Sequence, residues 1–337
     1  MSPPALTVAI PCRDAGPFLR PLLESLLRQT LADFRLLLVD DGSSDDSGAI
    51  AHAVAGDRIR IVRNATALGI GANWNRCAEL AADSDYFCLA HQDDVYHSTF
   101  LERLTDALTE RPDAGIAHCR ANAIDGDGRP LDSGAERYKQ HFWRRIPAPD
   151  RASHYQRLWR GNFLCCPAVL YRTAAWRAAG EFRTDLRFAL DWEYWFRLLR
   201  CGYDIVDVDA ALLDYRRHDT AATAAATSDR WRFAEELAVL DEARSAGLAA
   251  GLLPADTGPS PALRNNLLHE ALTDLERGDR DGAARKLEFV RDHAPNLWND
   301  RYVRTFRALI RCGAPGRMLL GACRGLAIRF GLGGATG

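Results

Sequence analysis

The sequence predicts an α/β protein with a mostly parallel sheet and helices on both faces, followed by an all-helical C-terminal region. Over the first hundred residues, short apolar runs alternate with segments whose apolar residues recur at helical spacing. This alternation is typical of parallel strands joined by crossover helices. After Ala221 the alternation stops and only helical patterns remain. We therefore expect two domains, at residues 1–225 and 226–337, as the length of 337 residues also suggests.

The first strand–helix–strand unit has the clearest pattern. Residues 6–10 form an apolar, β-rich run that is stopped by Pro11. Residues 18–29 carry apolar side chains at helical spacing, and residues 34–39 form the next strand, so the crossover should be right-handed. Further strands are expected at residues 58–62, 86–90, 114–118, 161–170 and 205–208, with an extended segment at 212–218. Helices are expected after Ser47 and at residues 74–82, 98–110, 173–179 and 190–200.

Two pairs of carboxylates follow apolar strands. Asp40 and Asp41 close the run at 34–39, and Asp93 and Asp94 come after the run at 86–90. In open α/β sheets, ligands bind just outside the carboxyl ends of the strands. Hard oxygen ligands suit Mg²⁺ or Mn²⁺. The sequence therefore predicts a divalent cation and a polyhydroxylated, phosphorylated ligand at this edge.

The composition excludes several classes of protein. With 47% hydrophobic and 26% charged residues and a net charge of −2, the chain is typical of a soluble enzyme, and no nucleic-acid partner is expected. The nine cysteines are scattered without a C-x-x-C pair, which indicates reduced thiols rather than disulfides or a zinc site. No signal peptide or membrane-spanning run is apparent, so a cytoplasmic location is expected. Gly69 and Gly71 lack the third glycine and the position of a dinucleotide-binding fingerprint.

Two other regions carry distinct patterns. Residues 133–150 are polar and aromatic without a clear period, and we interpret them as a loop over the site. Residues 262–277 and 281–293 resemble a single tetratricopeptide-type hairpin. Residues 301–337 contain seven arginines and no acidic residue, interleaved with apolar side chains. This tail is compatible with binding to an anionic membrane surface, although such a run is more often a solvated helix face.

Four stretches, in this order and spacing, resemble the family 2 inverting glycosyltransferases of the GT-A fold. They are VAIPCRD at 8–14, LLLVDDGSSDDS at 36–47, NWNRCAELAADSDYFCLAHQDDVY at 73–96, and DWEYWFRLLRCGYDI at 191–205 followed by YRRH at 215–218. The resemblance covers about residues 5–225. It implies transfer of a sugar from a nucleoside diphosphate sugar to a hydroxyl of a glycan or lipid-linked acceptor, at the inner face of the cell membrane.

The resemblance also implies roles for individual residues. Asp191 would be the general base that deprotonates the acceptor hydroxyl, so that one in-line attack inverts the anomeric centre. Asp93 would bind the ribose or the donor sugar, and Asp94 would hold the Mg²⁺ or Mn²⁺ that bridges the diphosphate. Pro11, Arg13, Asp40 and Asp41 would line the nucleotide pocket. The remaining candidates are Arg216 and Arg217 at the diphosphate, His218 at the metal, and Trp192 and Trp195 stacked on sugar faces.

Simpler interpretations of these residues stay open. Asp40 and Asp41 are also typical turn residues, Asp191 is a typical helix cap, and buried tryptophans are more often core. The family motif is commonly D-x-D-D, and His91 stands where its first acid would be. Two alternatives therefore remain: a nucleotidyltransferase, which would need a glycine-rich basic loop after the first strand, and a non-catalytic scaffold that retains nucleotide binding.

Overall fold

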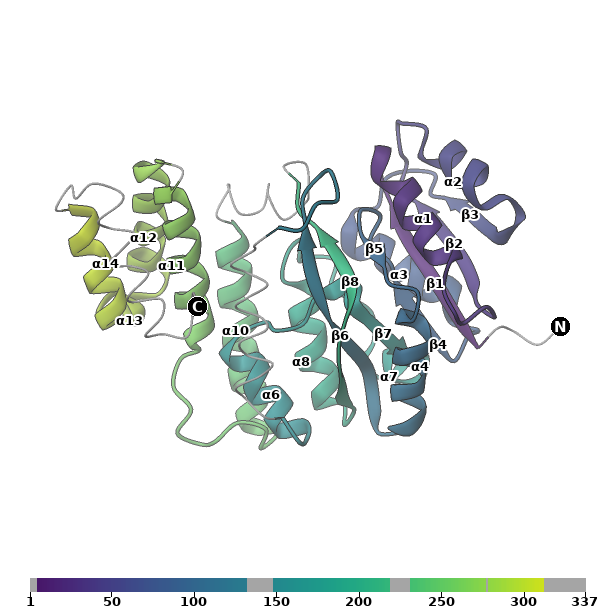
Figure 1. Ribbon diagram of the computed structural model, residues 1–337. Helices are drawn as coiled ribbons and strands as arrows, with labels where there is room; N and C mark the ends of the chain where they lie inside the picture. Colours follow the sequence, from purple (N-terminus) through teal and green to yellow (C-terminus); the bar gives the residue numbers. More distant parts are fainter. Residues whose placement is uncertain (1–4, 132–147, 219–230, 277, 312–337) are drawn as a thin grey trace. The chain divides into compact units, whose positions relative to one another are not determined.

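An eight-stranded sheet is the framework of the N-terminal part of the chain, with the strand order β3-β2-β1-β4-β7-β6-β8-β5 (Figure 1). β1 pairs in parallel with β2 and β4, β2 with β3, and β6 with β8. β7 is antiparallel to β4 and β6, and β5 is antiparallel to β8. The strands are β1 (Leu6–Cys12), β2 (Arg35–Asp40), β3 (Ile59–Arg63), β4 (Tyr86–Leu89), β5 (Val95–Tyr96), β6 (Ala114–Ile124), β7 (Val169–Arg172) and β8 (Asp204–Arg216).

This computed structural model describes residues 5–131, 148–218, 231–276 and 278–311. The chain forms two compact units. The first comprises Met1–Glu136, Ala148–Tyr155 and Leu164–Asp219, and the second comprises Arg137–Pro147, Gln156–Phe163 and Thr220–Gly337. The boundary expected between residues 225 and 226, and most of the loop expected at 133–150, lie outside the described residues.

Helices cover both faces of the sheet, as the sequence predicts. On one face, Leu36 and Leu38 of β2 join a buried cluster with Leu22 of α1 and Leu104 of α4. On the opposite face, Phe87 of β4 stacks on Tyr171 of β7 and meets Trp176 of α7 edge-on. Successive strand residues point to opposite faces, so both layers form from the same strands. The helices are α1 (Leu19–Leu27), α2 (Ser47–Ala55), α3 (Ile70–Ala81), α4 (Phe100–Glu110), α6 (Arg151–Arg160), α7 (Thr173–Ala179) and α8 (Leu190–Arg200).

The sequence predicts that the first strand ends at Pro11. In the structure β1 continues through Pro11 to Cys12. Ala9 O accepts a hydrogen bond from Ala90 N, and Cys12 O accepts one from Asp41 N. Backbone groups along a strand alternate sides, so Pro11 faces the same side as Ala9, beyond the last β1–β4 pair at Ala9 and Leu89. The missing N–H of proline therefore breaks no hydrogen bond of the sheet.

The second half of the sheet differs most from the sequence-based expectation. β6 and β8 are long strands paired over most of their length, where the sequence predicts shorter separate segments. The register between them shifts near Cys119 and Arg120, which is why the apolar pattern is interrupted there. The short strand β5 and the helix α6 were not predicted.

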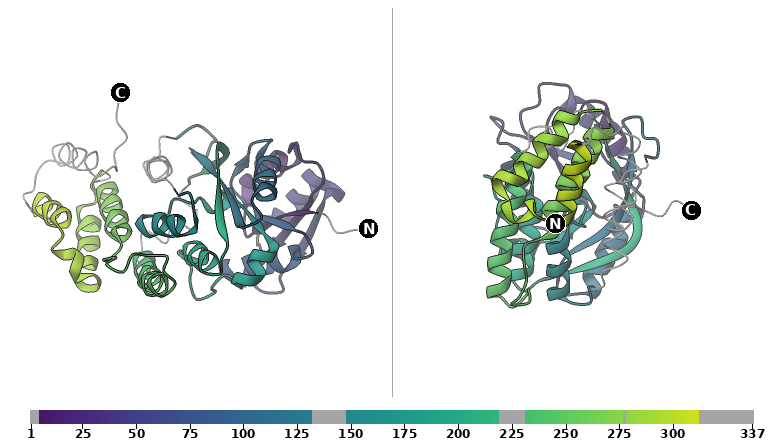
Figure 2. Two further views of the ribbon diagram at one scale, coloured as in Figure 1. Left: turned by 90° about the horizontal axis from the view of Figure 1, so that it is seen from below. Right: turned by 90° about the vertical axis from the view of Figure 1, so that its left-hand side faces the viewer.

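The second unit is helical, as predicted (Figure 2). Its helices are α10 (Trp231–Ala249), α11 (Pro261–Glu276), α12 (Arg280–His293), α13 (Pro295–Trp298) and α14 (Arg301–Arg311). Asp279 caps α12 by accepting a hydrogen bond from Gly282 N at 2.7 Å, and Lys286 pairs with Asp274 across the α11–α12 hairpin. Within the described ranges, no helix is both long and apolar enough to span a membrane.

The thiols of the described residues are free, as expected from the cysteine pattern. Six of these cysteines are buried and Cys201 is exposed. Burial raises the pKa of the Cys12 thiol to about 12, although hydrogen bonding to Ser47 opposes the shift. This thiol is therefore protonated near neutral pH.

Candidate functional site

The carboxyl ends of the parallel strands bring the two acidic pairs to one edge of the sheet. Cys12 and Asp40 are partners in the register of β1 and β2, and Asp41 N donates to Cys12 O at 2.7 Å. On the other side of β1, Ala90 N continues the ladder to Ala9 O at 2.8 Å, just before the Asp93–Asp94 pair. Pro11 lies between these positions, partly buried and opposite Val39.

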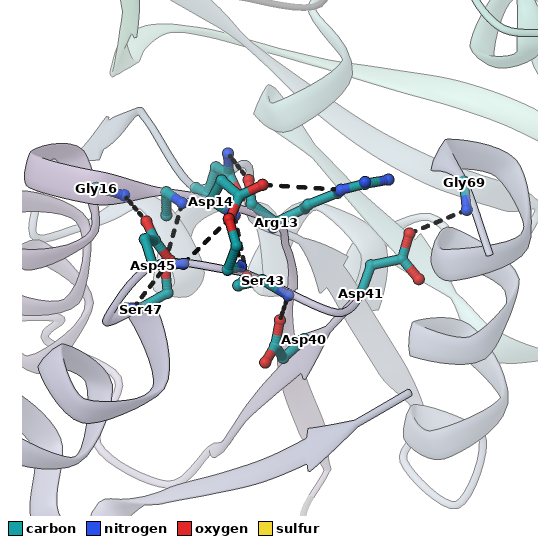
Figure 3. Close-up of polar contacts among 12 residues, drawn as sticks. Arg13, Asp14, Gly16, Asp40, Asp41, Ser43, Asp45, Ser47 and Gly69 are labelled. Atoms are coloured by element: carbon teal, nitrogen blue, oxygen red, sulfur yellow. Dashed lines mark hydrogen bonds and ion pairs between the residues drawn. The ribbon is translucent and has the colours of Figure 1, made fainter. Parts of the chain in front are cut away.

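Asp40 holds the turn that follows β2. Its Oδ1 accepts a hydrogen bond from Ser43 N at 2.8 Å (Figure 3). Its Oδ2 pairs with Arg63 Nη1 at 2.7 Å. Arg63 also donates through Nη2 to Ser43 O. The Asp40 carboxylate is buried, where an uncompensated charge would be costly. The Arg63 guanidinium and the Ser43 N–H compensate it. Its contacts are those of a turn residue.

Asp41 is buried beside it and faces the start of α3. Its Oδ1 accepts hydrogen bonds from Leu68 N at 2.7 Å and from Asn64 Nδ2 at 2.9 Å. Its Oδ2 accepts from Gly69 N at 2.9 Å (Figure 3). A carboxylate offers about four lone-pair positions. The three donors leave one position on Oδ2 for another group.

The loop after β1 is shaped by polar contacts that the sequence analysis missed. Asp14 is at φ 48°, in the left-handed region, and its Oδ1 accepts hydrogen bonds from the backbone and hydroxyl of Ser44. The backbone hydrogen bond from Ser44 is the main cause that lowers the pKa of Asp14. Gly16 N donates to Asp45 Oδ2 at 2.9 Å. The polar run from Ser43 to Ser47 was the available signal, since such residues pair with loop backbone.

Arg13 is held by its backbone and exposed at its side chain. Gln92 accepts from Arg13 N at 2.7 Å and donates to Arg13 O at 3.0 Å, so one amide satisfies both backbone groups. The Arg13 side chain is 57% exposed. Gln92 lies between His91 and Asp93, and this position in the acidic motif was its only sequence signal. The contact ties the loop after β1 to the loop after β4.

The two aspartates after β4 have different environments. Asp93 keeps about 20% of its side chain exposed, and its Oδ2 lies 2.9 Å from Nε2 of His218, which is 13% exposed. Asp94 is fully buried, and its Oδ1 accepts a hydrogen bond from Arg216 N at 2.9 Å. Asp93 is thus the acid directed toward His218, while Asp94 fixes the end of β8.

The two arginines expected at the diphosphate, Arg216 and Arg217, lie at the end of β8 and directly after it. Arg216 is buried, and its guanidinium donates to the backbone oxygens of Asp93 at 2.8 Å and Asp125 at 3.0 Å. These contacts connect the end of β8 to the loop after β4 and to the turn after β6. Arg217 is partly exposed, with its guanidinium 5.4 Å from the ring centre of Tyr215.

His91 lies where the family motif commonly has an acid. Its ring centre is 5.4 Å from that of Trp74 on α3. Burial lowers the pKa of His91, against the opposing charge of Asp93, so the imidazole is neutral near pH 7. This edge therefore carries a neutral ring in place of a third carboxylate.

Asp191 lies in the first turn of α8 and is partly exposed. Its Oδ1 accepts a hydrogen bond from Trp192 N at 2.6 Å, and a carboxylate in this turn also interacts favourably with the helix dipole. Trp192 and Trp195 are buried, with 2% and 0% exposure. The ring of Trp192 stacks on Phe196 at 6.2 Å. This burial favours core packing over a sugar platform for both tryptophans.

The residues grouped near the acidic edge do not form an all-protein metal cage. Across the described ranges, no cluster of three or more His, Cys, Asp or Glu side chains is arranged to hold a metal ion. The pair of Asp93 and His218 supplies one carboxylate and one imidazole. Any cation there needs further ligands from a bound substrate or water.

Comparison with known proteins agrees with this architecture. Residues 7–177 match the family model described as glycosyl transferase family 2. An uncharacterized protein of Mycobacterium tuberculosis is 32% identical over 65% of this chain and 69% of its own length. The uncharacterized glycosyltransferase EpsJ of Bacillus subtilis is 27% identical over 65% of this chain and 63% of its own. A PGL/p-HBAD biosynthesis glycosyltransferase of Mycobacterium bovis is 28% identical over 58% of this chain and 69% of its own length.

Solved structures share the fold at lower identity. TarS residues 1–349 of S. aureus, in complex with UDP-GlcNAc, align with a TM-score of 0.58 and 15% identity over 87% of this chain and 74% of that one. The mannosyltransferase PcManGT of Pyrobaculum calidifontis, in complex with GDP-Man and Mn²⁺, aligns with a TM-score of 0.55 and 16% identity. The alignment covers 89% of this chain and 88% of that one. The matching family model covers half of the chain. The chain therefore belongs to glycosyl transferase family 2 and is an enzyme of the glycosyltransferase class.

Proposed function

We propose that the enzyme moves a sugar from a nucleoside diphosphate sugar to an acceptor hydroxyl, with inversion and with Mg²⁺ or Mn²⁺. The observation that carries this proposal is the edge of the sheet where β2, β4 and β8 end, which presents Asp41, Asp93 and His218. The fold neighbours bound to UDP-GlcNAc, and to GDP-Man with Mn²⁺, support a donor of this class.

Asp93 and His218 fit a cation that is shared with the donor. Their facing atoms are 2.9 Å apart and both side chains are partly exposed. Mg²⁺ and Mn²⁺ are usually held by one or two carboxylates together with substrate phosphates. When bound, the cation would neutralise the charge that develops on the leaving diphosphate. Asp94 as the metal ligand also stays a prediction, although its burial and its bond to Arg216 N favour a supporting role.

On the nucleotide side, Arg13 and Asp41 have complementary roles. The exposed guanidinium of Arg13 can pair with phosphate oxygens, while its backbone is held by Gln92. The remaining lone pair on Asp41 Oδ2 can accept one hydrogen bond from the base or the ribose. Asp40, with both oxygens engaged, supports the loop.

Asp191 is our candidate for the general base. It would take the proton of the acceptor hydroxyl as that oxygen attacks the anomeric carbon and the bond to the diphosphate breaks. No covalent enzyme intermediate forms, so the anomeric configuration inverts. Its position in the first turn of a helix with a buried face supports a fixed carboxylate.

The first test is a thermal-shift panel of UDP, GDP, dTDP and CDP, each with and without Mn²⁺, on the full chain and on Asp93→Ala. We expect one diphosphate to raise the melting temperature only with the cation, and the variant to lose this response. A ligand at roughly 100 times its Kd adds about 2.7 kcal/mol, which is readily measured. If no diphosphate stabilises the protein in either condition, the donor site is wrongly assigned.

Turnover then tests the base. With the matching nucleotide sugar, Asp191→Asn should keep the diphosphate response while product formation falls by roughly 100-fold to 10,000-fold. The anomeric configuration of the product, read by NMR, should be inverted. Retention of configuration would contradict the single-step mechanism, and undiminished turnover in Asp191→Asn would exclude this residue as the base.

The acceptor we propose is a hydroxyl of a glycan, including one linked to a lipid at the cytoplasmic face of the membrane. The exposed arginines of α14, Arg301 and Arg304, support contact with an anionic surface. Relatives are described as glycosyltransferases of PGL/p-HBAD biosynthesis, which also supports a glycan product.

A further inference from the structure

One face of α3 packs against the segment that connects α7 to α8. Gly71, Trp74, Asn75 and Ala78 are all buried, and their spacing places them on one side of the helix. Three of them contact residues 182–184, just before the helix that carries Asp191.

Asn75 holds the backbone of Phe182 with both ends of its amide. Nδ2 donates to Phe182 O at 2.8 Å, and Oδ1 accepts from Phe182 N at 2.8 Å. Asn75 is 4% exposed and Phe182 is 1% exposed, so water does not compete for these groups. Removing the amide would leave two backbone groups buried without partners, which is costly.

Gly71 fixes the distance between α3 and the same segment. A Cβ at this position would lie 2.9 Å from Arg183 O and 3.2 Å from Thr184 Cα. Both are backbone atoms, so a side chain at position 71 would push the segment away from α3. Gly71 and Asn75 are four residues apart and therefore act on the segment from adjacent turns.

Aromatic contacts link this segment to both parts of the candidate site. Trp74 meets the ring of Phe182 edge-on at 5.4 Å, and Phe182 lies 4.3 Å from Tyr194, one turn after Asp191 on α8. The ring of Trp74 also lies 5.4 Å from that of His91, two residues before Asp93. α3 therefore touches both the acidic motif and the support of α8.

α8 also contacts the segment. Arg197 donates to Glu181 O at 2.7 Å and to Ala179 O, and it is held in place by Glu193 at 2.9 Å. The segment is thus hydrogen-bonded both to α3 and to α8. Its position on α3 is set by Asn75 and Gly71.

We propose that Asn75 and Gly71 are positioning residues that set the location of Asp191 relative to the acidic motif. The inference rests on the proposed function, in which Asp191 is the general base. A base acts only within hydrogen-bond reach of the proton that it removes. A displacement of about 1 Å caused by a remote change can lower the rate by roughly 100-fold.

The test compares Asn75→Ala and Gly71→Ala with Thr7→Val in the full-length enzyme. Thr7→Val is the matched control because it removes two hydrogen bonds, to Ser84 and from Arg35, near the start of β1. We expect both α3 variants to lower kcat by roughly 10-fold to 100-fold, with the donor KM and the cation-dependent diphosphate response retained. Hydrogen exchange should rise in residues 181–194. Thr7→Val should lower the melting temperature but leave kcat and this exchange unchanged.

Two results would overturn the proposal: kcat falling in Thr7→Val as much as in the α3 variants at equal loss of stability, or unchanged kcat and exchange in Gly71→Ala. Gly71→Ala removes no hydrogen bond, so it remains informative if Asn75→Ala fails to fold. Failure of the proposed function has a different signature. Asp191→Asn would then keep full turnover, while Asn75→Ala would still increase exchange in residues 181–194.

Discussion

His218 Nε2 lies 2.9 Å from Asp93 Oδ2, although 125 residues separate them in the sequence. The contact exists because β8 runs to this edge of the sheet and is fixed there. Arg216 N donates to Asp94, and the Arg216 guanidinium donates to Asp93 O. The sequence resemblance assigns the metal to Asp94, but the acid that faces His218 is its neighbour Asp93.

This geometry separates the roles of the two aspartates. Asp93→Ala and His218→Ala should each abolish the cation-dependent stabilisation by a nucleoside diphosphate while changing the unliganded protein little, because both side chains are partly exposed. Asp94→Ala should instead lower the free energy of unfolding by about 1.5–3 kcal/mol, since a buried bond to a charged acceptor is lost. Urea unfolding and Mn²⁺ titration measure the two effects.

Asp94→Asn is the control, because an amide oxygen can still accept the hydrogen bond from Arg216 N. We expect it to keep both stability and the response to Mn²⁺. If Asp94→Asn loses the response with its stability intact while Asp93→Ala keeps it, Asp94 is the metal ligand.

The elements that the sequence predicts well are those with a local pattern. The segments that became β1 to β4 and α8 have apolar residues at the period of their own structure, and α8 matches its expected bounds at Leu190–Arg200. The pairing of β6 with β8 joins residues about 90 positions apart and contains register shifts, so no local period describes it. The antiparallel direction of β7 is also set by its partners rather than by its own residues.

The site shows the same division. The acidic pairs are visible because each lies at the end of an apolar run or within three residues of it. The amide contacts of Gln92 with Arg13 and of Asn75 with Phe182 span 79 and 107 residues, and single polar residues of this kind leave no periodic signal. Burial of Trp195 was equally hidden, because an aromatic residue has the same sequence signature in a core and on a sugar platform.

Trp195 should behave as a core residue. It is fully buried on α8, so Trp195→Ala is expected to lower the free energy of unfolding by about 3–5 kcal/mol. Trp195→Phe should recover most of this loss and should leave the KM values for donor and acceptor unchanged. Chemical denaturation and steady-state kinetics check both. A large rise in acceptor KM for Trp195→Phe, with stability retained, would support sugar stacking instead.

His154 should make stability depend on pH. Its Nδ1 lies 2.7 Å from Asp204, which also pairs with Arg111, and its Nε2 lies 3.9 Å from Asp207. Burial alone lowers the pKa of His154, but the hydrogen bonds to Asp204 and Asp207 outweigh it and raise the pKa above the usual 6.5. The folded state therefore holds this proton more tightly than the unfolded chain. The resulting stabilisation is complete below about pH 6.5 and is lost as the pH rises through the folded value.

His154→Gln provides the comparison, since glutamine keeps a polar side chain but does not titrate. The free energy of unfolding of the wild type, measured in urea at several pH values, should exceed that of the variant most at mildly acidic pH. The difference should shrink at alkaline pH. A difference that stays constant or grows as the pH rises would show that folding does not raise the pKa of His154.

The basic helix α14 should bind anionic membranes through charge rather than by insertion. Its apolar residues Val303 and Phe306 are buried within the helical unit, whereas Arg301 and Arg304 are exposed. An interfacial helix inserts its apolar face, and here that face is already covered. Each basic residue near an anionic surface contributes about 1 kcal/mol, so replacing both arginines with glutamate should weaken binding to phosphatidylserine vesicles by at least roughly 30-fold.

The matched variant Arg58→Glu/Arg103→Glu changes the net charge equally at exposed positions of the other unit and should bind like the wild type. Because the attraction is electrostatic, the wild type should dissociate as salt is raised. Binding that persists at high salt or on neutral vesicles would contradict this mode.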